Sequence, residues 1–318
     1  MITRVTLRDF KAHKLLEFDS LPLLSVLVGR NNTGKSAVFH ALLVPQVGPT
    51  LSPAFPIGDT SQIVRHGAPT AQVEIGYSTS PAILRVQFNA NGGWSGPVWV
   101  GSGKQEAPRA FYLSAVRTAS VRFNYEGLQR DVGAEGEHTW NILHQLKADD
   151  DPRFQKIVEW AVKLGMGIES IGTPTTLGAP YQGQIAPVTY GHKANLVLHG
   201  SGTWSVLPII VQGVLCEPGE TLLVEEPESH LHRESIDALW GFFAECAKRD
   251  VQVICASHSL DLLASMSERI EKGEVPKDSA IFHIRRDSHG NTTVERLDPS
   301  VFRSIRKRIR EDLAGHGV

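Results

Sequence analysis

The fold of this chain is decided by one segment, Leu23-Leu24-Ser25-Val26-Leu27-Val28-Gly29-Arg30-Asn31-Asn32-Thr33-Gly34-Lys35-Ser36. A short apolar run ends at Gly29, and a second apolar run, Ala37 to Leu43, has the composition of a helix. Between these two runs the residues follow the pattern G-x-x-x-x-G-K-S. This pattern predicts a phosphate-binding loop that joins a buried strand to a helix.

The residue types in this loop suit a bound triphosphate. Gly29 and Gly34 allow backbone torsions that other residues avoid, so successive amide groups can point inward at phosphates. The helix that opens at Gly34 adds its positive N-terminal end. We expect Lys35 to reach the β and γ phosphates and the Ser36 hydroxyl to bind Mg²⁺. The predicted ATP-binding residues are Gly29, Asn31, Asn32, Thr33, Gly34, Lys35, Ser36 and Ala37.

Length and composition place the chain among ordinary globular proteins. It has 318 residues, of which 41% are hydrophobic, and this is enough for one or two domains with a sizeable core. A formal net charge of -2 gives no general attraction to nucleic acid, although it leaves room for a local basic patch. No apolar run reaches membrane-spanning length and the first residues are no signal peptide, so we expect a cytoplasmic protein. The three scattered cysteines predict buried free thiols.

Strand-like and helix-like stretches alternate along the chain. Residues 2–20 predict a hairpin that leads into the phosphate-loop strand, and residues 71–100 predict further antiparallel strands. Apolar positions recur at helical intervals over residues 137–166, whereas the Pro- and Gly-rich stretches 45–56 and 172–187 predict loops. In the last third, buried strands alternate with helices, which predicts a parallel sheet covered on both faces.

Basic residues gather in the turn of the N-terminal hairpin and in a helix predicted over residues 302–313, after an edge hairpin at 280–294. The turn, with Lys11, His13 and Lys14, is either solvated or close to the base or ribose of a nucleotide. The helix is either an exposed helix whose charge is partly balanced by acidic neighbours or a contact for nucleic-acid phosphates. Its basic residues are Arg303, Arg306, Lys307, Arg308 and Arg310.

A pair of carboxylates follows a buried strand predicted at Thr221–Val224. An apolar strand that ends in acidic residues, downstream of a phosphate loop, is the Walker B arrangement. We predict that Glu225 serves Mg²⁺, usually through water, and that Glu226 polarises the attacking water as general base. Glu228 either assists Glu225 and Glu226 or is an ordinary surface carboxylate, and the sequence favours neither interpretation.

His258 follows the next buried strand, Val251–Ala256. The carboxyl edge of a parallel sheet is where ligands bind in such folds. We therefore predict that His258 hydrogen-bonds the γ-phosphate and senses its loss. His230 and His232 flank Leu231, but no third ligand lies near them in the sequence, so we expect no metal site there.

Together these motifs resemble those of the ABC-type, AAA-family ATPases of the RecF/SMC/OLD (overcoming-lysogenization-defect) branch, over nearly the whole chain. The resemblance implies an α/β fold, an ABC-type P-loop ATPase head with a mixed or parallel central sheet, an antiparallel β lobe and a helical lobe. It is carried by Leu7–Lys11, Gly29–Ser36, Tyr112–Arg117, Glu225–His232 and Ala256–Ser259.

The resemblance also implies that a single head is built from four consecutive parts. These are an N-terminal β lobe with the Walker A loop (1–110), a helical or insert lobe (111–198), a lobe with the signature loop, Walker B and the switch histidine (199–280), and a C-terminal hairpin with the basic helix (281–318).

In this family two heads pair head-to-tail and enclose two ATP molecules, each between one subunit's phosphate loop and the other's signature loop. The signature loop here would be Gly200-Ser201-Gly202, which departs from the usual Leu-Ser-Gly-Gly-Gln form and has a simple helix N-cap as its alternative. A glutamine also contacts Mg²⁺ in this family, and of the candidates Gln62 and Gln46 we favour Gln62. The implied cofactors are ATP and Mg²⁺.

Two features that some relatives carry are missing from this sequence. No long coiled coil separates the ATPase halves, and the residues after Ala280 are too few for a toprim nuclease domain. We therefore expect a homodimeric or higher-oligomeric ATPase that switches a separate nuclease or effector, in DNA repair or in defence against phages and plasmids. A RecF-like ATPase that acts on DNA directly is the alternative. A transporter ATPase with a membrane partner fits the N-terminal segment less well, and no membrane association is expected.

Overall fold

The structure is a computed structural model, in which residues 1–48, 60–102, 107–117, 123–124, 129–176, 179–183, 185–189, 191–194, 196, 199–287, 291–299 and 302–314 are described. Most of the loop predicted at 45–56 and the tip of the hairpin predicted at 280–294 lie outside these residues. None of the helices in the described part of the chain has the length and apolar content that crossing a bilayer requires.

A six-stranded sheet forms the centre of the molecule, with the strand order β17-β16-β3-β15-β14-β7. Its inner strands are parallel, and β17 is an antiparallel edge strand. The predicted mixed or parallel central sheet is therefore confirmed. The strands are β3 (Leu24–Val28), β7 (Ala110–Leu113), β14 (Thr221–Glu225), β15 (Gln252–Ser257), β16 (Ala280–Arg286) and β17 (Thr292–Leu297).

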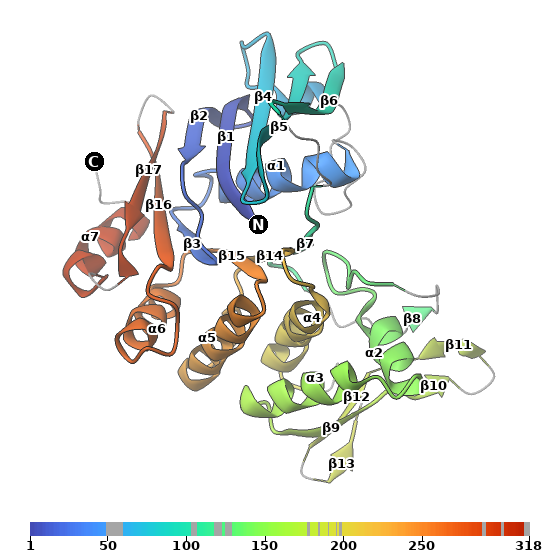
Figure 1. The fold of residues 1–318 in the computed structure, drawn as a ribbon. Coiled ribbons are helices and arrows are strands. Elements are labelled where there is room, and N and C mark those ends of the chain that lie inside the picture. The colour runs from blue at the N-terminus through green and yellow to red at the C-terminus, as the bar shows by residue number, and fades with distance from the viewer. Residues whose placement is uncertain are drawn as a thin grey trace.

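A second, antiparallel sheet lies above the central sheet, with the order β2-β1-β4-β5-β6 (Figure 1). Alternate residues of β4 are buried, as expected for strands with one face on the core. The predicted hairpin at 2–20 and the antiparallel strands at 71–100 are confirmed. The strands are β1 (Ile2–Phe10), β2 (His13–Phe18), β4 (Thr70–Tyr77), β5 (Ser80–Asn89) and β6 (Trp94–Val100).

Helix α1 (Lys35–Val47) is enclosed between the two sheets, and its apolar side chains belong to the same core as Leu27 of β3. The prediction that a loop begins at Pro45 is wrong, because the helix runs through this proline and ends at Val47. A proline inside a helix removes one backbone hydrogen bond. Here the buried face of α1, with Phe39 and Leu42, outweighs that loss by packing on both sheets.

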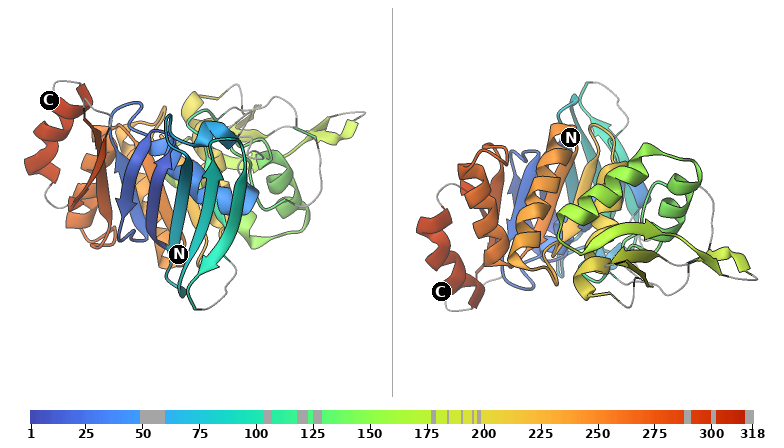
Figure 2. Two further views of the ribbon diagram at one scale, coloured as in Figure 1. Left: turned by 90° about the horizontal axis from the view of Figure 1, so that it is seen from above. Right: turned by 90° about the horizontal axis from the view of Figure 1, so that it is seen from below.

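Helices cover the other face of the central sheet, and Val26 and Val28 of β3 point into this second core. Figure 2 shows the antiparallel sheet facing the viewer from above and these helices facing the viewer from below. The helices are α4 (Ser201–Leu215), α5 (Arg233–Lys248) and α6 (Leu260–Glu271), with α7 (Phe302–Ala314) beside α6. Two apolar cores therefore hold the central sheet from both sides, as predicted.

The insert between β7 and α4 contains both helices and short strands. Helices α2 (Thr139–Ala148) and α3 (Pro152–Lys163) match the prediction, and the Asp151 carboxylate accepts from the Arg153 amide at 2.8 Å as an N-cap. The prediction of a loop over 172–187 is wrong, because antiparallel partners convert its β-prone residues into strands. The strands are β8 (Phe123–Asn124), β9 (Ile168–Gly172), β10 (Thr175–Thr176), β11 (Ala179–Gly183), β12 (Ala186–Thr189) and β13 (His192–Lys193).

Candidate functional site

A cavity of about 690 Å³ lies at the carboxyl ends of β3, β14, β15 and β16. Its volume is in the range of small-molecule and cofactor sites. Because these strands are parallel, residues far apart in the sequence meet at one edge of the sheet. The cavity is lined by Lys11, Ala12, Asn31, Asn32, Gly34, Lys35, Ser36, Ala37, Ala115, Glu225, Glu226, Ala256 and Arg286.

The loop between β3 and α1 has the geometry that its glycines predict. Gly34 has a φ of 93°, in the left-handed region, and Asn32 has a φ of 63°. A Cβ atom at Gly29 would collide with the carbonyl oxygen of Ile284, so only glycine fits there. Gly34, the N-cap of α1, has no side chain that could cap the first turn, and Lys35, Ser36 and Ala37 of that turn line the cavity.

Lys35 is folded back onto its own loop. Its Nζ donates to the carbonyl oxygen of Gly29 at 2.8 Å and to that of Arg30 at 3.0 Å. Burial lowers the pKa of this ammonium group, while the charges of Glu226 and Glu225 act to raise it. The lysine is thus a buried cation held beside two carboxylates in the cavity wall.

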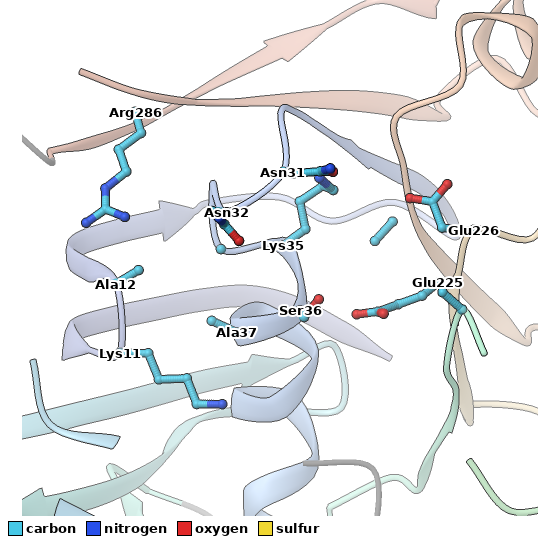
Figure 3. A pocket seen from close by; sticks show the side chains of 13 residues that line it. Lys11, Ala12, Asn31, Asn32, Lys35, Ser36, Ala37, Glu225, Glu226 and Arg286 are labelled. Atoms are coloured by element: carbon cyan, nitrogen blue, oxygen red, sulfur yellow. The ribbon is translucent and has the colours of Figure 1, made fainter. Parts of the chain in front are cut away.

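Glu225 is the last residue of β14, and its side chain points toward the same part of the cavity as Ser36 (Figure 3). Its Oε1 atom is buried and has no hydrogen-bond partner among the described residues. The Tyr112 hydroxyl hydrogen-bonds the Glu225 carboxylate, and burial raises the pKa of that tyrosine far above its usual value. A carboxylate oxygen without a partner, next to a serine hydroxyl, fits the oxygen donors that Mg²⁺ prefers.

Glu226 lines the cavity next to Glu225 and has an unusual backbone, with a φ of 44°. Its amide donates to the carbonyl oxygen of Ala256 at 2.8 Å, which joins the ends of β14 and β15. The Nδ1 atom of His258 lies 2.7 Å from Glu226 Oε1 and donates to it. His258 is exposed, with 60% of its side chain accessible, and is held at the cavity edge by this contact.

Glu228 lies deeper than the sequence suggested. The hydroxyl of Ser257 donates to its carboxylate, and Glu228 Oε2 has no partner among the described residues. Burial first, and the charge of Glu226 second, raise the pKa of Glu228 to about 8. A largely protonated carboxyl group therefore adjoins the predicted general base at neutral pH.

The predicted signature residues line a different cavity, of about 350 Å³. Gly200 is the N-cap of α4, Ser201 and Gly202 begin the helix, and His230 and His232 line the same cavity. Of the described residues, none lines both this cavity and the one at the phosphate loop. The first turn of α4 has no side-chain cap among these residues. Within one chain the predicted signature loop and phosphate loop thus face separate cavities.

Neither candidate glutamine lines the phosphate-loop cavity. Gln62 lies in the 3₁₀ helix η1 (Thr60–Ile63) and is exposed. Gln46 lies near the end of α1, about 15 Å from Ser36 along the helix axis at 1.5 Å per residue. Its Oε1 accepts from the Ala110 amide at 3.0 Å, which fixes it to β7. A role for Gln62 at Mg²⁺ stays a prediction.

Two further parts of the chain reach the cavity: the basic turn of the first hairpin, for which the sequence left proximity to a nucleotide as one of two alternatives, and Arg286, which the sequence did not single out. Lys11 and Ala12 line the cavity, so this turn lies against the phosphate loop, and burial lowers the pKa of Lys11 to about 8. His13 is fully buried: its Nε2 donates to the Gly34 carbonyl at 3.1 Å, and its Nδ1 accepts from Thr292 at 3.1 Å. Arg286 reaches the cavity because β16 pairs with β3. No local pattern in the sequence predicts the pairing of β16 with β3.

Residues 187–265, which contain the predicted signature loop, the predicted Walker B pair and His258, match the family described as AAA domain, putative AbiEii toxin, Type IV TA system. A sequence search of curated proteins finds no match.

Solved structures match over nearly the whole chain. An SMC head bound to the C-winged helix domain of ScpA is 15% identical, with a TM-score of 0.64 over 93% of this chain and 98% of that one. An Smc head with an extended coiled coil, bound to the C-terminal domain of ScpA from Pyrococcus furiosus, is 13% identical, with a TM-score of 0.61 over 97% and 99%. The SMC head from Thermotoga maritima is 11% identical, with a TM-score of 0.50 over 93% and 98%.

These matches confirm the fold class and the resemblance predicted from the sequence. The chain has the fold of the ABC-type ATPase heads of SMC proteins.

Proposed function

We propose that this protein is an ATPase that binds ATP with Mg²⁺ in the phosphate-loop cavity, hydrolyses it to ADP and phosphate, and pairs head-to-tail with a second copy. The observation that carries this proposal is the meeting of Lys35, Ser36, Glu225 and Glu226 in one cavity (Figure 3). This is the set of groups that phosphoryl transfer to water requires: a cation, a metal site and a base.

Binding is proposed to use the loop amides and Lys35. On binding, the Lys35 ammonium exchanges its carbonyl partners, Gly29 and Arg30, for phosphate oxygens. The uncapped first turn of α1 donates its amides to the same anion. Ser36 and Glu225 are the residues that would hold Mg²⁺, which supplies charge neutralisation at the phosphates.

Hydrolysis is proposed to use Glu226 as the base. Its carboxylate orients a water molecule and accepts a proton from it as the water attacks. His258 donates to this carboxylate at 2.7 Å and so fixes its orientation. We propose that the same histidine, whose exposed ring contacts Glu226, also contacts the γ-phosphate.

Dimerisation is proposed because the predicted signature loop and the phosphate loop of one chain line separate cavities. The N-terminus of α4, with Ser201, has no side-chain cap from its N-cap residue and is a set of donors suited to a terminal phosphate. A second copy in head-to-tail orientation brings the two faces together. ATP would then hold the dimer together and hydrolysis would release it.

A separate protein is proposed to bind this ATPase in a way that depends on its dimerisation. The SMC heads that share the fold are bound to ScpA domains in their crystal structures, so this architecture can carry a protein partner. We propose a nuclease or effector of DNA repair or defence as the partner here. ATP-driven pairing would present or withdraw the surface to which that partner binds.

Direct action on DNA is a second candidate function, and helix α7 favours it. Arg306, Lys307 and Arg310 are exposed on this helix. The ion pair of Lys307 with Glu311 is long, at 3.8 Å, and exposed, so it offsets the charge of Lys307 toward phosphates only weakly. Fluorescence anisotropy with a labelled duplex at increasing salt tests this: steeply salt-dependent binding that Arg306→Gln weakens supports it, and no binding at low salt contradicts it.

The proposed ATPase is tested with the purified protein. Titration with a fluorescent ATP analogue and a phosphate-release assay are run with Mg²⁺ and with excess chelator. We expect nucleotide binding in both conditions and phosphate release with Mg²⁺ only. A protein that binds no ATP, or one whose phosphate release is the same without Mg²⁺, contradicts the proposal.

A further inference from the structure

Arg117 is a buried cation outside the cavity lining. It follows β7, and only 2% of its surface is exposed. Burial lowers the pKa of this guanidinium to about 10, while Glu228 and Glu226 act to raise it, so it stays charged at neutral pH. Its donors reach four backbone carbonyl oxygens, those of Ser114, Ser205 (2.6 Å), Glu225 (2.8 Å) and Glu226 (2.9 Å).

Two of these carbonyls belong to the peptide backbone of the predicted base. The Glu225 carbonyl precedes Glu226 and the Glu226 carbonyl follows it, so Arg117 holds this residue from both sides. Glu226 has a φ of 44°, a conformation that costs a non-glycine residue free energy. Such a backbone persists only where its surroundings hold it, and the guanidinium supplies this support together with the Ala256 carbonyl, which accepts from the Glu226 amide.

Another carbonyl belongs to the helix of the signature loop. Ser205 lies on the second turn of α4, and its hydroxyl also donates to the Ser229 carbonyl at 3.1 Å. A Cβ atom at Gly202 would come within 2.6 Å of the His230 carbonyl oxygen, so the first turn of α4 lies directly on the loop that follows Glu226. The start of α4 and the backbone of residues 225–230 are thus one packed unit.

We propose that Arg117 is a positioning residue that fixes Glu226 relative to the signature helix α4, so that the general base and the signature loop of one chain move together. This inference rests on the proposed ATPase function. In the head-to-tail dimer these two parts serve different nucleotides. A shift of α4 against the partner's phosphate is therefore transmitted to the base of the other site.

Arg249 is a matched control, because its guanidinium also binds backbone carbonyls of α4 but has no contact with Glu226 among the described residues. Arg249 donates to backbone carbonyls at the opposite end of the same helix, those of Gly213 (2.5 Å), Val214 (3.4 Å) and Cys216 (3.3 Å). Arg117→Lys and Arg249→Lys each keep the charge and lose the forked geometry of the donors. The two arginines differ in that Arg117 binds the backbone of Glu226, the proposed base, whereas the backbone carbonyls that Arg249 binds are those of α4 and its C-cap.

The experiment measures melting temperature, affinity for a fluorescent ATP analogue and kcat of the full-length wild type and both variants. It also measures the change in Trp204 fluorescence on ATP binding, taken as the difference between each protein and its Trp204→Phe form. Trp204 adjoins Ser205 and its ring lies 6.3 Å from that of His230, so it reports on the start of α4.

For Arg117→Lys we expect ATP affinity close to wild type and no change in Trp204 fluorescence on ATP binding. We expect kcat to be lower by about 100-fold, because misplacing a reacting group by about 1 Å costs this much. For Arg249→Lys we expect a lower melting temperature with kcat and the Trp204 signal retained.

The inference is overturned if Arg117→Lys has the kcat of the wild type, or if both variants lose kcat and ATP affinity alike. A wild type without turnover contradicts the proposed function as well. A wild type that hydrolyses ATP beside an equally active Arg117→Lys contradicts this inference alone.

Discussion

Helices α1 and α4 each have a glycine N-cap, Gly34 and Gly200, and the first turn of each lines a cavity, yet their surroundings differ. The cavity at α1 contains Lys35, Glu225 and Glu226. Of the described residues that line the cavity at α4, none is Lys, Arg, Asp or Glu. The first helix end lies beside a cation and carboxylates that suit phosphate binding and hydrolysis. The second lies beside uncharged hydroxyl groups, those of Ser201, Thr203 and Ser235, and two imidazoles.

This difference teaches that the second helix end is suited to complete a site and unsuited to form one alone. A helix N-terminus contributes a modest attraction for an anion unless other charges assist it. The N-terminus of α4 is therefore expected to bind a phosphate only when another chain already holds that phosphate. Because the N-terminus of α4 needs a phosphate that a second chain holds, we expect the pairing of two chains to depend on ATP.

The largest expected effect comes from removing the base beside α1. Glu226→Gln keeps the size of the side chain and its contact with His258, but it cannot accept a proton. We expect kcat to fall by about 10²–10⁴-fold with ATP affinity retained, since general-base catalysis contributes this much. Phosphate-release and binding assays check it, with Glu159→Gln on α3 as the control. Unchanged turnover would remove Glu226 from the role of base.

The next effect concerns the cation beside α1. Lys35→Ala deletes charge-assisted hydrogen bonds to phosphate worth about 3 kcal/mol, which corresponds to ~100-fold weaker ATP binding. Titration with a fluorescent ATP analogue measures it. Lys163→Ala, which removes an exposed lysine that contacts Trp160, is the control. Normal ATP affinity of Lys35→Ala would contradict the phosphate-loop assignment.

A smaller effect is expected at the metal. Glu225→Gln replaces the buried oxygen that has no partner among the described residues by an uncharged amide. Residues that hold a metal through water typically contribute 10- to 100-fold to its affinity, so we expect about tenfold more Mg²⁺ at half-maximal ATPase rate. A Mg²⁺ titration of turnover measures this. The same Mg²⁺ requirement in wild type and variant would show that Glu225 does not serve the metal.

The smallest effect is on stability. Glu228 has a pKa of about 8 in the folded protein, above its ordinary value of 4.5. The folded state thus keeps a proton that the unfolded state releases, and stability falls as pH rises from about 4.5 to about 8. Glu228→Gln has no proton to release here, so the melting temperature of this variant should decline less with rising pH than that of the wild type. Parallel declines in scanning calorimetry would contradict the buried, protonated Glu228.

The parts of the site that could be predicted from sequence are those encoded in short contiguous segments. Gly29 to Ser36 and the pair Glu225-Glu226 each follow a strand, and parallel strands deliver their ends to one edge whatever the rest of the chain does. The mixed sheet and the antiparallel lobe follow from the same strand patterns.

The remaining residues depend on pairings that no local pattern specifies. Arg286 reaches the cavity only because β16 joins β3, across more than two hundred and fifty residues of chain. His13 supports Gly34 only because the first hairpin folds over the phosphate loop. The short strands within 172–187 form because partners are present, and Pro45 stays helical because α1 is packed on two sheets.

The most direct test of the account is the mass of the Glu226→Gln protein with Mg²⁺ and ATP, measured by light scattering after gel filtration, alone and combined with Ser201→Arg. We expect about twice the chain mass of 34.8 kDa for the single variant with ATP and the mass of one chain without it. The double variant should still bind ATP and remain a single chain. A single variant that stays at 34.8 kDa with ATP bound, or a double variant that still dimerises, would contradict pairing through the end of α4.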